Sequence, residues 1–180
     1  RSVLEATTLR LSLKSSFSNT PTLLNTLRSF FGRDKELTKA MRNLLGFTPR
    51  NVSVYRLALI HRSAGEKLPD GTLISNERLE FLGDAIISSV VAEILYLKFP
   101  KKSEGELTQM RARIVSRESL NKFGDKLGLE PLIRYQKTKN KFNSLLGNTF
   151  ESIIGAMLLD IGYKTTVLAL KKHIFNNTLK

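Results

Sequence analysis

The chain has no cysteine, no tryptophan and only two histidines. Without cysteine, disulfide bonds, thiolate zinc sites and a cysteine nucleophile are excluded. The two histidines, His61 and His173, are too few for a histidine-rich metal site. Without tryptophan, and with aromatic residues that are mostly phenylalanine at helical spacing, no base-stacking surface for single-stranded nucleic acid is evident. No apolar run approaches the roughly 18 residues that span a bilayer, so we expect no membrane segment.

Acidic residues are scarce compared with basic ones. The sequence contains 16 Asp and Glu against 29 Lys and Arg, which gives a formal net charge of +13. A chain this basic commonly binds a polyanion, because each phosphate contact releases condensed counterions. The alternative is a basic surface that is only solvated. With 180 residues, of which 41% are hydrophobic, the chain suits one domain with a real core. Composition therefore favours nucleic acid as the partner but indicates no reaction.

Helical periodicity extends over nearly all of the chain from Pro21 onward. The first 20 residues are rich in Ser and Thr and contain a single acid, so a transit-like segment, a vector-derived tail and a helical arm all remain open. We expect one all-α domain over residues 21–180, with no strand and with polar loops near residues 64–75 and 136–143. The expected helices cover residues 21–31, 34–45, 51–61, 76–99, 103–115, 117–127, 144–161 and 164–175. Ser103, followed three residues later by Glu106, predicts a capping box at the start of the helix over residues 103–115.

In the longest of these helices, apolar residues at steps of three and four predict the buried stripe. Further apolar side chains widen this stripe, so we expect the helix to be buried on most sides. The stripe comprises Leu79, Leu82, Ile86, Val90 and Ile94.

Acidic residues lie at helical spacing on two otherwise apolar helices. Glu77, Glu80 and Asp84 share one face of the first, and Asn148 and Glu151 share one face of the second. If these helices pack side by side, their oxygen atoms converge into the kind of cluster that Mg²⁺ prefers. The alternative is a solvated face whose acids pair with Lys and Arg, and Glu77 suits the positive end of the helix dipole.

Four ordered motifs resemble the ribonuclease III family. The longest, NERLEFLGDA at residues 76–85, matches the family signature without a departure that we can identify. His61-Arg62-Ser63 resembles its upstream His-x-Ser segment, residues 104–115 resemble the stretch after the signature helix, and residues 147–160 resemble its second acidic segment. The resemblance covers about residues 34–172. It implies a helical bundle that forms a two-fold dimer.

The resemblance also implies an activity and a set of site residues. Family members cut both strands of double-stranded RNA with Mg²⁺, for which Mn²⁺ is an alternative, and leave 5′-phosphates and short 3′ overhangs. Such members process rRNA and mRNA precursors. No His or Ser nucleophile is needed, so we expect His61 to be a packed residue at a helix end. The implied metal-site residues are Glu80, Asp84, Asn148 and Glu151, with Asp84 and Glu151 as catalytic residues and with Glu77 and Glu104 as supporting acids.

Further implications concern the partners. Phe81 matches an aromatic residue that inserts into a socket on the second subunit, the alternative being an ordinary core phenylalanine. Candidate contacts to RNA phosphates are Arg111, Arg113, Arg117, Lys137, Lys139 and Lys141. The family normally carries a C-terminal double-stranded-RNA-binding domain, which this chain does not contain. A cytoplasmic location is expected, or an organellar one if the first 20 residues are a transit peptide.

Asn148 departs from the family, which usually has Asp at this position. Asn keeps an oxygen that can ligate Mg²⁺ or orient its water, but it contributes no negative charge, so metal affinity is expected to be weaker. Three explanations compete: a natural variant that still cuts, an engineered Asp→Asn trap, and a silenced relative that only binds RNA. The intact remainder of the motif favours the natural variant.

Overall fold

A computed structural model describes residues 34–136 and 144–172. The chain divides into two compact units, residues 1–37 and 38–180. Of the first unit, only Asp34–Leu37 are described, as the start of helix α3 (Asp34–Leu45). The domain boundary and the helix expected before residue 32 lie outside the described residues.

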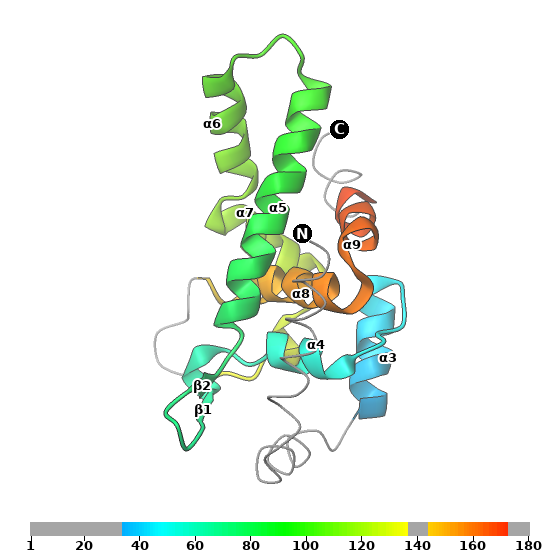
Figure 1. Ribbon diagram of the computed structural model, residues 1–180, viewed down its shortest axis with the longest axis vertical. Helices are drawn as coiled ribbons and strands as arrows, with labels where there is room; N and C mark the ends of the chain where they lie inside the picture. The colour runs from blue at the N-terminus through cyan, green and yellow to red at the C-terminus, as the bar shows by residue number, and fades with distance from the viewer. Residues whose placement is uncertain (1–33, 137–143, 173–180) are drawn as a thin grey trace, which may run out of the picture. The chain divides into compact units, whose positions relative to one another are not determined.

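The second unit is built mainly of helices, which confirms the all-α prediction (Figure 1). None of the described helices is both long and apolar enough to cross a membrane. Ser103 and Glu106 form the expected capping box at the start of α6, since each side chain bonds the other's backbone. The helices after α3 are α4 (Val52–Ala58), α5 (Glu77–Lys98), α6 (Glu104–Ile114), α7 (Arg117–Lys126), α8 (Leu145–Ile161) and α9 (Tyr163–Leu170), with 3₁₀ turns at Arg62–Ala64 and Glu130–Leu132.

Helix α8 is the centre of this unit. It is buried along most of its length and packs against α5, α7, α4 and α9. Glycine allows α5 and α8 to touch at their backbones. A Cβ atom on Gly83 would stand 1.8 Å from the backbone oxygen of Glu151, and one on Gly155 would stand 2.2 Å from that of Leu79. The crossing therefore fixes the acid-bearing turns of α5 and α8 against each other.

The buried stripe of α5 differs from the predicted one. The buried residues are Leu79, Gly83, Ile87, Val90, Val91 and Leu95. Leu82, Ile86 and Ile94 are only half-buried, so their assignment to the core stripe was wrong. Helix α5 contacts α8 through Gly83, and a pattern of apolar side chains gives no weight to glycine. The buried face of α5 is therefore rotated relative to the predicted stripe. The prediction that α5 is buried on most sides was also wrong, because Tyr96 and Leu97 are exposed.

The segment between α4 and α5 also departs from the prediction. The helix expected to reach His61 ends at Ala58, because the His61 N–H donates to the carbonyl of Arg134 instead of continuing the helix. His61 is buried and caps the 3₁₀ turn Arg62–Ala64. The prediction that no strand is present was wrong on a small scale: β1 (Glu66–Lys67) and β2 (Leu73–Ile74) form an antiparallel hairpin.

Asp160 ties the end of α8 to the start of α4. Its carboxylate accepts hydrogen bonds from the backbone N–H groups of Arg50 (3.0 Å) and Asn51 (2.7 Å), and from the Tyr55 hydroxyl (3.0 Å). Burial, reinforced by the Asp160 charge, raises the pKa of Tyr55 well above its usual value, so the hydroxyl stays a donor. A carboxylate at a helix N-terminus also suits the helix dipole. This contact anchors α8 at the end away from its acidic turn.

Candidate active site

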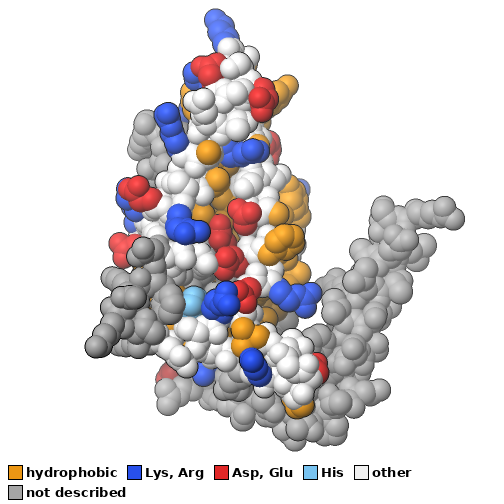
Figure 2. Space-filling model, turned by 90° about the vertical axis from the view of Figure 1, so that its left-hand side faces the viewer, with side chains coloured by type: hydrophobic (Ala, Val, Ile, Leu, Met, Phe, Trp, Pro, Cys, Tyr) orange, Lys and Arg blue, Asp and Glu red, His pale blue; other side chains and the backbone are white. Residues whose placement is uncertain are grey.

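Helices α5 and α8 bring four of the predicted site residues together. The side-chain amide of Asn148 donates a hydrogen bond to the Glu80 carboxylate, and the charges of Asp84 and Glu80 both act on Glu151. Figure 2 shows acidic side chains gathered in a line along the middle of one face, beside a strip of hydrophobic side chains. We call Glu80, Asp84, Asn148 and Glu151 the acid cluster.

Glu151 is the most deeply buried acid of the cluster. Only 9% of its surface is exposed. Burial, then repulsion from Asp84 and Glu80, raises its pKa to about 7, and the positive charge of Arg117 opposes this rise. Without a cation, Glu151 is therefore only partly ionised near neutral pH. Such a site stores electrostatic repulsion that a bound cation would relieve.

The ionised form of Glu80 is also destabilised, but less strongly than that of Glu151. Burial, then repulsion from Glu77, raises its pKa, while the hydrogen bond from Asn148 and the charge of Arg117 lower it. An ionised Asp at position 148 has no proton to donate and would add a further negative charge. Asn148 therefore reduces the repulsion within the cluster when no metal is bound.

The start of α8 is held in place by α7. The Asn121 side-chain oxygen accepts the Gly147 N–H at 2.7 Å, directly before Asn148 in the chain. One turn further along, the Ser152 hydroxyl donates to the Asn148 carbonyl at 2.7 Å. Sequence reasoning missed Asn121, since nothing in the spacing along one helix indicates a contact 26 residues away. These bonds fix the backbone that carries Asn148.

Glu77 lies at the edge of the acid cluster. It is exposed, forms an ion pair with Arg62 at 3.2 Å and accepts a hydrogen bond from the Ser75 hydroxyl at 3.2 Å. It is close enough to Glu80 to raise the pKa of that residue. The sequence showed Arg62 only as part of the His61-Arg62-Ser63 motif. Its ion pair with Glu77 could not be predicted from residue spacing, because the two residues belong to different elements. The structure thus brings Glu77 beside the acid cluster, where its negative charge is paired with the Arg62 side chain.

Glu104 is not brought to the acid cluster within one chain. It begins α6, accepts a hydrogen bond from the Thr108 hydroxyl at 2.9 Å, and lines a groove between α5 and α6 with Tyr96. Tyr96 lies 16 residues beyond Glu80 on α5, or about 24 Å along a helix that rises about 1.5 Å per residue. A supporting role for Glu104 would therefore need a second copy of the chain.

The predicted RNA contacts differ in their surroundings. Arg117, the first residue of α7, is exposed and acts electrostatically on Glu80 and Glu151. Arg113 is exposed in the last turn of α6, whereas Arg111 lines the groove between α5 and α6. Lys137, Lys139 and Lys141 lie outside the described residues.

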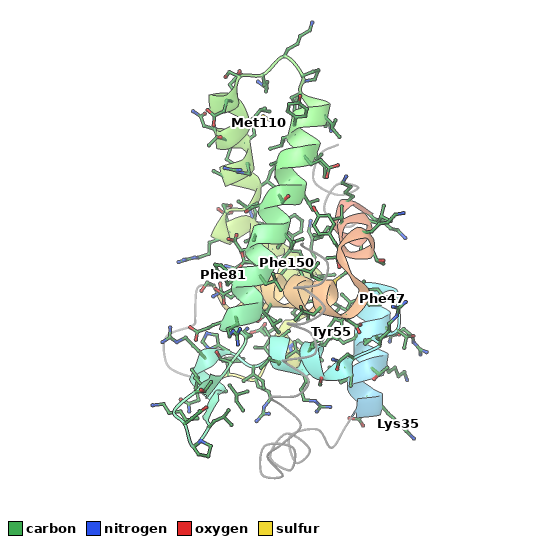
Figure 3. All side chains as sticks on the ribbon, in the orientation of Figure 1. Lys35, Phe47, Tyr55, Phe81, Met110 and Phe150 are labelled. Atoms are coloured by element: carbon green, nitrogen blue, oxygen red, sulfur yellow. The ribbon has the colours of Figure 1, made fainter. Side chains whose placement is uncertain are left out.

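Phe81 projects from α5 immediately after Glu80 (Figure 3). Its side chain is 80% exposed, so within one chain it is not a core residue. A phenylalanine exposed to this degree beside an acid cluster is available for contact with another surface.

The oxygen atoms of the acid cluster are suitable ligands for a divalent cation. It offers carboxylate oxygens and one amide oxygen, with no nitrogen or sulfur donor, and this is the donor set that Mg²⁺ selects. Among the described residues, no three side chains of His, Cys, Asp or Glu already form a group that could hold a metal ion. Binding would therefore require the carboxylates to rotate toward a common point, which their mutual repulsion opposes until a cation is present.

Comparisons with known proteins show the family of the chain. Residues 51–178 match the Ribonuclease-III-like family. Ribonuclease 3 of Azobacteroides pseudotrichonymphae is 44% identical over 154 residues, which cover 86% of this chain and 59% of that protein. Ribonuclease 3 of Phocaeicola vulgatus is also 44% identical, over 149 residues, which cover 82% of this chain and 47% of that protein. The chain belongs to the ribonuclease III family.

A solved structure extends the match to three dimensions. The nuclease domain of ribonuclease III from Campylobacter jejuni superimposes with a TM-score of 0.68 at 30% identity, covering 78% of this chain and 97% of that one. The chain thus spans about half the length of the curated relatives that it matches, yet nearly all of that nuclease domain.

Proposed function

We propose that the second unit is the catalytic domain of a ribonuclease III, which hydrolyses phosphodiester bonds of double-stranded RNA with Mg²⁺ or Mn²⁺. The products would carry 5′-phosphates and short 3′ overhangs. The observation that carries the proposal is the meeting of Glu80, Asp84 and Glu151 with Asn148 across the α5–α8 contact. Membership of the family and the match to a nuclease domain support it.

In this proposal each member of the cluster has a distinct task. Glu80, Asp84 and Glu151 would hold the metal, and Asn148 would offer its amide oxygen to the metal or to a metal-bound water. The metal, when bound, would activate a water nucleophile and stabilise charge on the phosphate. Glu151 would have to release its proton to act as a ligand. Because its pKa is about 7, the site would be poorly prepared for metal at mildly acidic pH.

Double-stranded RNA is the proposed substrate because the chain offers positive charge without base-stacking tryptophan. The net charge is +13, and a duplex is recognised mainly through its shape and its phosphates. Arg113 and Arg117 are exposed and available for such contacts. Each would contribute an electrostatic contact that weakens as salt increases.

A two-fold dimer would supply one acid cluster for each strand of the duplex. The exposed Phe81 beside the cluster supports such a contact. The related nuclease domain of ribonuclease III from Campylobacter jejuni has a region that is involved in dimer formation. We propose that Phe81 inserts into a second copy of the chain, which would bury its ring.

Replacing Phe81 with serine is expected to convert a dimeric chain into a monomer with its fold intact, because the side chain makes little contact within its own chain. Sedimentation equilibrium measures the change. Leu168→Ser is the control, since Leu168 is also exposed but lies on α9. A Phe81→Ser chain that dimerises as tightly as the parent would refute the proposed contact.

The second candidate is a silenced relative that binds duplex RNA without cutting it. Asn148 favours this candidate, because the metal site has one negative charge fewer than the family usually provides. The three retained carboxylates and the hydrogen bond from Asn148 to Glu80 favour the enzyme.

Asn148→Asp distinguishes the two candidates. Under the enzyme proposal both chains cut a long duplex RNA, and the Asp form binds Mg²⁺ more tightly by about tenfold, since ligand charge sets affinity. The metal-free Asp form is expected to be less stable by about 1 kcal/mol, because a hydrogen bond to Glu80 is replaced by repulsion. Cleavage by the Asp form alone would instead identify the parent as silenced, and cleavage by neither would reject the enzyme.

A further inference from the structure

Arg117 brings a permanent positive charge to the acid cluster. Its charge acts on both Glu80 and Glu151, which come from different helices. None of the described ion pairs includes Arg117, so its charge acts through space rather than through a contact. It is also exposed, at the first residue of α7. Arg117 is therefore not locked in a structural pair.

The position of Arg117 follows from the packing of α7 on α8. Arg117 and Asn121 are four residues apart on α7 and so lie on the same face. The Asn121 side chain accepts the N–H of Gly147, the residue before Asn148. Nearby on the same two helices, the rings of Phe123 on α7 and Phe150 on α8 stack with their centroids 5.7 Å apart. These contacts hold the start of α7 beside the acidic turn of α8.

The stability of helix α7 gives no reason for a positive charge at position 117. The N-terminal turn of a helix favours negative charge, so an Arg at the first position is locally unfavourable. Arg is always ionised, so it would keep its charge at any pH at which the enzyme works. Arg117 and Asn148 therefore both reduce the net negative charge at the cluster: Arg117 adds a positive charge, and Asn148 is neutral where relatives of this family usually have Asp.

We propose that Arg117 is a positioning residue that acts as a built-in counter-charge to the acid cluster. It stabilises the carboxylates before metal binds, competes with the divalent cation for them, and attracts a nearby RNA phosphate. This inference rests on the proposed function. It predicts effects of opposite sign, because one positive charge repels a metal ion and attracts a phosphate.

The test measures Mn²⁺ binding to the RNA-free chain by the loss of the free-ion signal in electron paramagnetic resonance. Arg117→Gln is expected to bind Mn²⁺ about fivefold more tightly than the parent, and Arg117→Lys is expected to stay within about twofold because it keeps the charge. A variant with a damaged structure would bind Mn²⁺ more weakly, so tighter binding by Arg117→Gln distinguishes the loss of charge from misfolding. Lys126→Gln is the matched control: it removes the same charge from an exposed position of α7, about 14 Å further along the helix.

The second measurement is the binding of a short duplex RNA in the presence of EDTA. Arg117→Gln is expected to bind about threefold more weakly, with a salt dependence reduced by about one phosphate contact. Unchanged or weaker Mn²⁺ binding by Arg117→Gln would overturn the inference while leaving the proposed function intact. If the parent binds no Mn²⁺, or if Glu151→Gln does not reduce that binding, the metal centre and the inference both fail.

Discussion

Glu151→Gln is expected to reduce the cleavage of duplex RNA by about a thousandfold while making the metal-free chain more stable at pH 8. The loss of activity is expected because Asn148 already supplies one neutral amide, and a second amide would leave only two carboxylates to hold the proposed cation, whose charge stabilisation contributes several kcal/mol. Single-turnover cleavage at saturating Mg²⁺ measures it. A variant that misfolds would lose activity and stability together, so the two opposite changes identify Glu151 as a functional residue.

The gain in stability has a defined pH range. The pKa of Glu151 rises from its usual 4.5 to about 7 in the folded chain. As the pH rises between these values, the unfolded chain releases the proton and the folded chain keeps it, so stability falls with pH and levels off above about 7. Glutamine resembles the protonated acid and avoids this loss. After allowance for solvent screening, the gain at pH 8 should be about 2 kcal/mol.

Urea denaturation in EDTA at pH 4 and pH 8 measures this difference. The parent and Glu151→Gln should be nearly equal in stability at pH 4, where Glu151 is mostly protonated in both the folded and the unfolded chain. At pH 8 the variant should be the more stable. Saturating Mg²⁺ should then reverse the order, because the parent binds the cation more tightly and gains more stability from it than the variant does. Equal stability at both pH values would show that Glu151 is not electrostatically strained.

Gly83→Ala is expected to destabilise the fold by about 3 kcal/mol or more. The new Cβ atom would stand 1.8 Å from the backbone oxygen of Glu151. Backbone cannot rotate away as a side chain can, so α5 and α8 must separate. Because this crossing also aligns the acid cluster, Mg²⁺ affinity should fall together with stability. Urea denaturation and Mn²⁺ titration measure the two effects.

Gly105→Ala is the matched control. Gly105 lies within α6, and a Cβ atom there meets nothing within 4 Å. Alanine is the better helix former, so this variant should be slightly stabilised, by about 0.5 kcal/mol. A Gly83→Ala chain as stable as the parent would contradict the close backbone contact between α5 and α8.

The sequence predicted the part of the site that depends on helical spacing. Steps of three and four placed Glu80 and Asp84 on one face, and Asn148 and Glu151 on another. The capping box at Ser103 was equally local, and the structure confirms it. Each of these features is fixed by residues within about two helical turns.

The features that the sequence did not predict depend on contacts between distant segments. The rotated stripe of α5 follows from the contact of Gly83 with α8, and an apolar pattern treats glycine as neutral. The short hairpin and the early end of α4 follow from hydrogen bonds between segments such as His61 and Arg134. Arg62 and Asn121 meet their partners across 15 and 26 residues of chain. No periodicity within one helix contains such information.

Cleavage of a long double-stranded RNA by the unmodified chain in Mg²⁺ tests the central proposal most directly. We expect cuts in both strands that leave 5′-phosphates and short 3′ overhangs, with single-stranded RNA of the same sequence left uncut and with all cleavage lost in EDTA. Intact duplex at high enzyme and metal concentrations would contradict the proposed function, provided that the same chain is folded and binds the duplex.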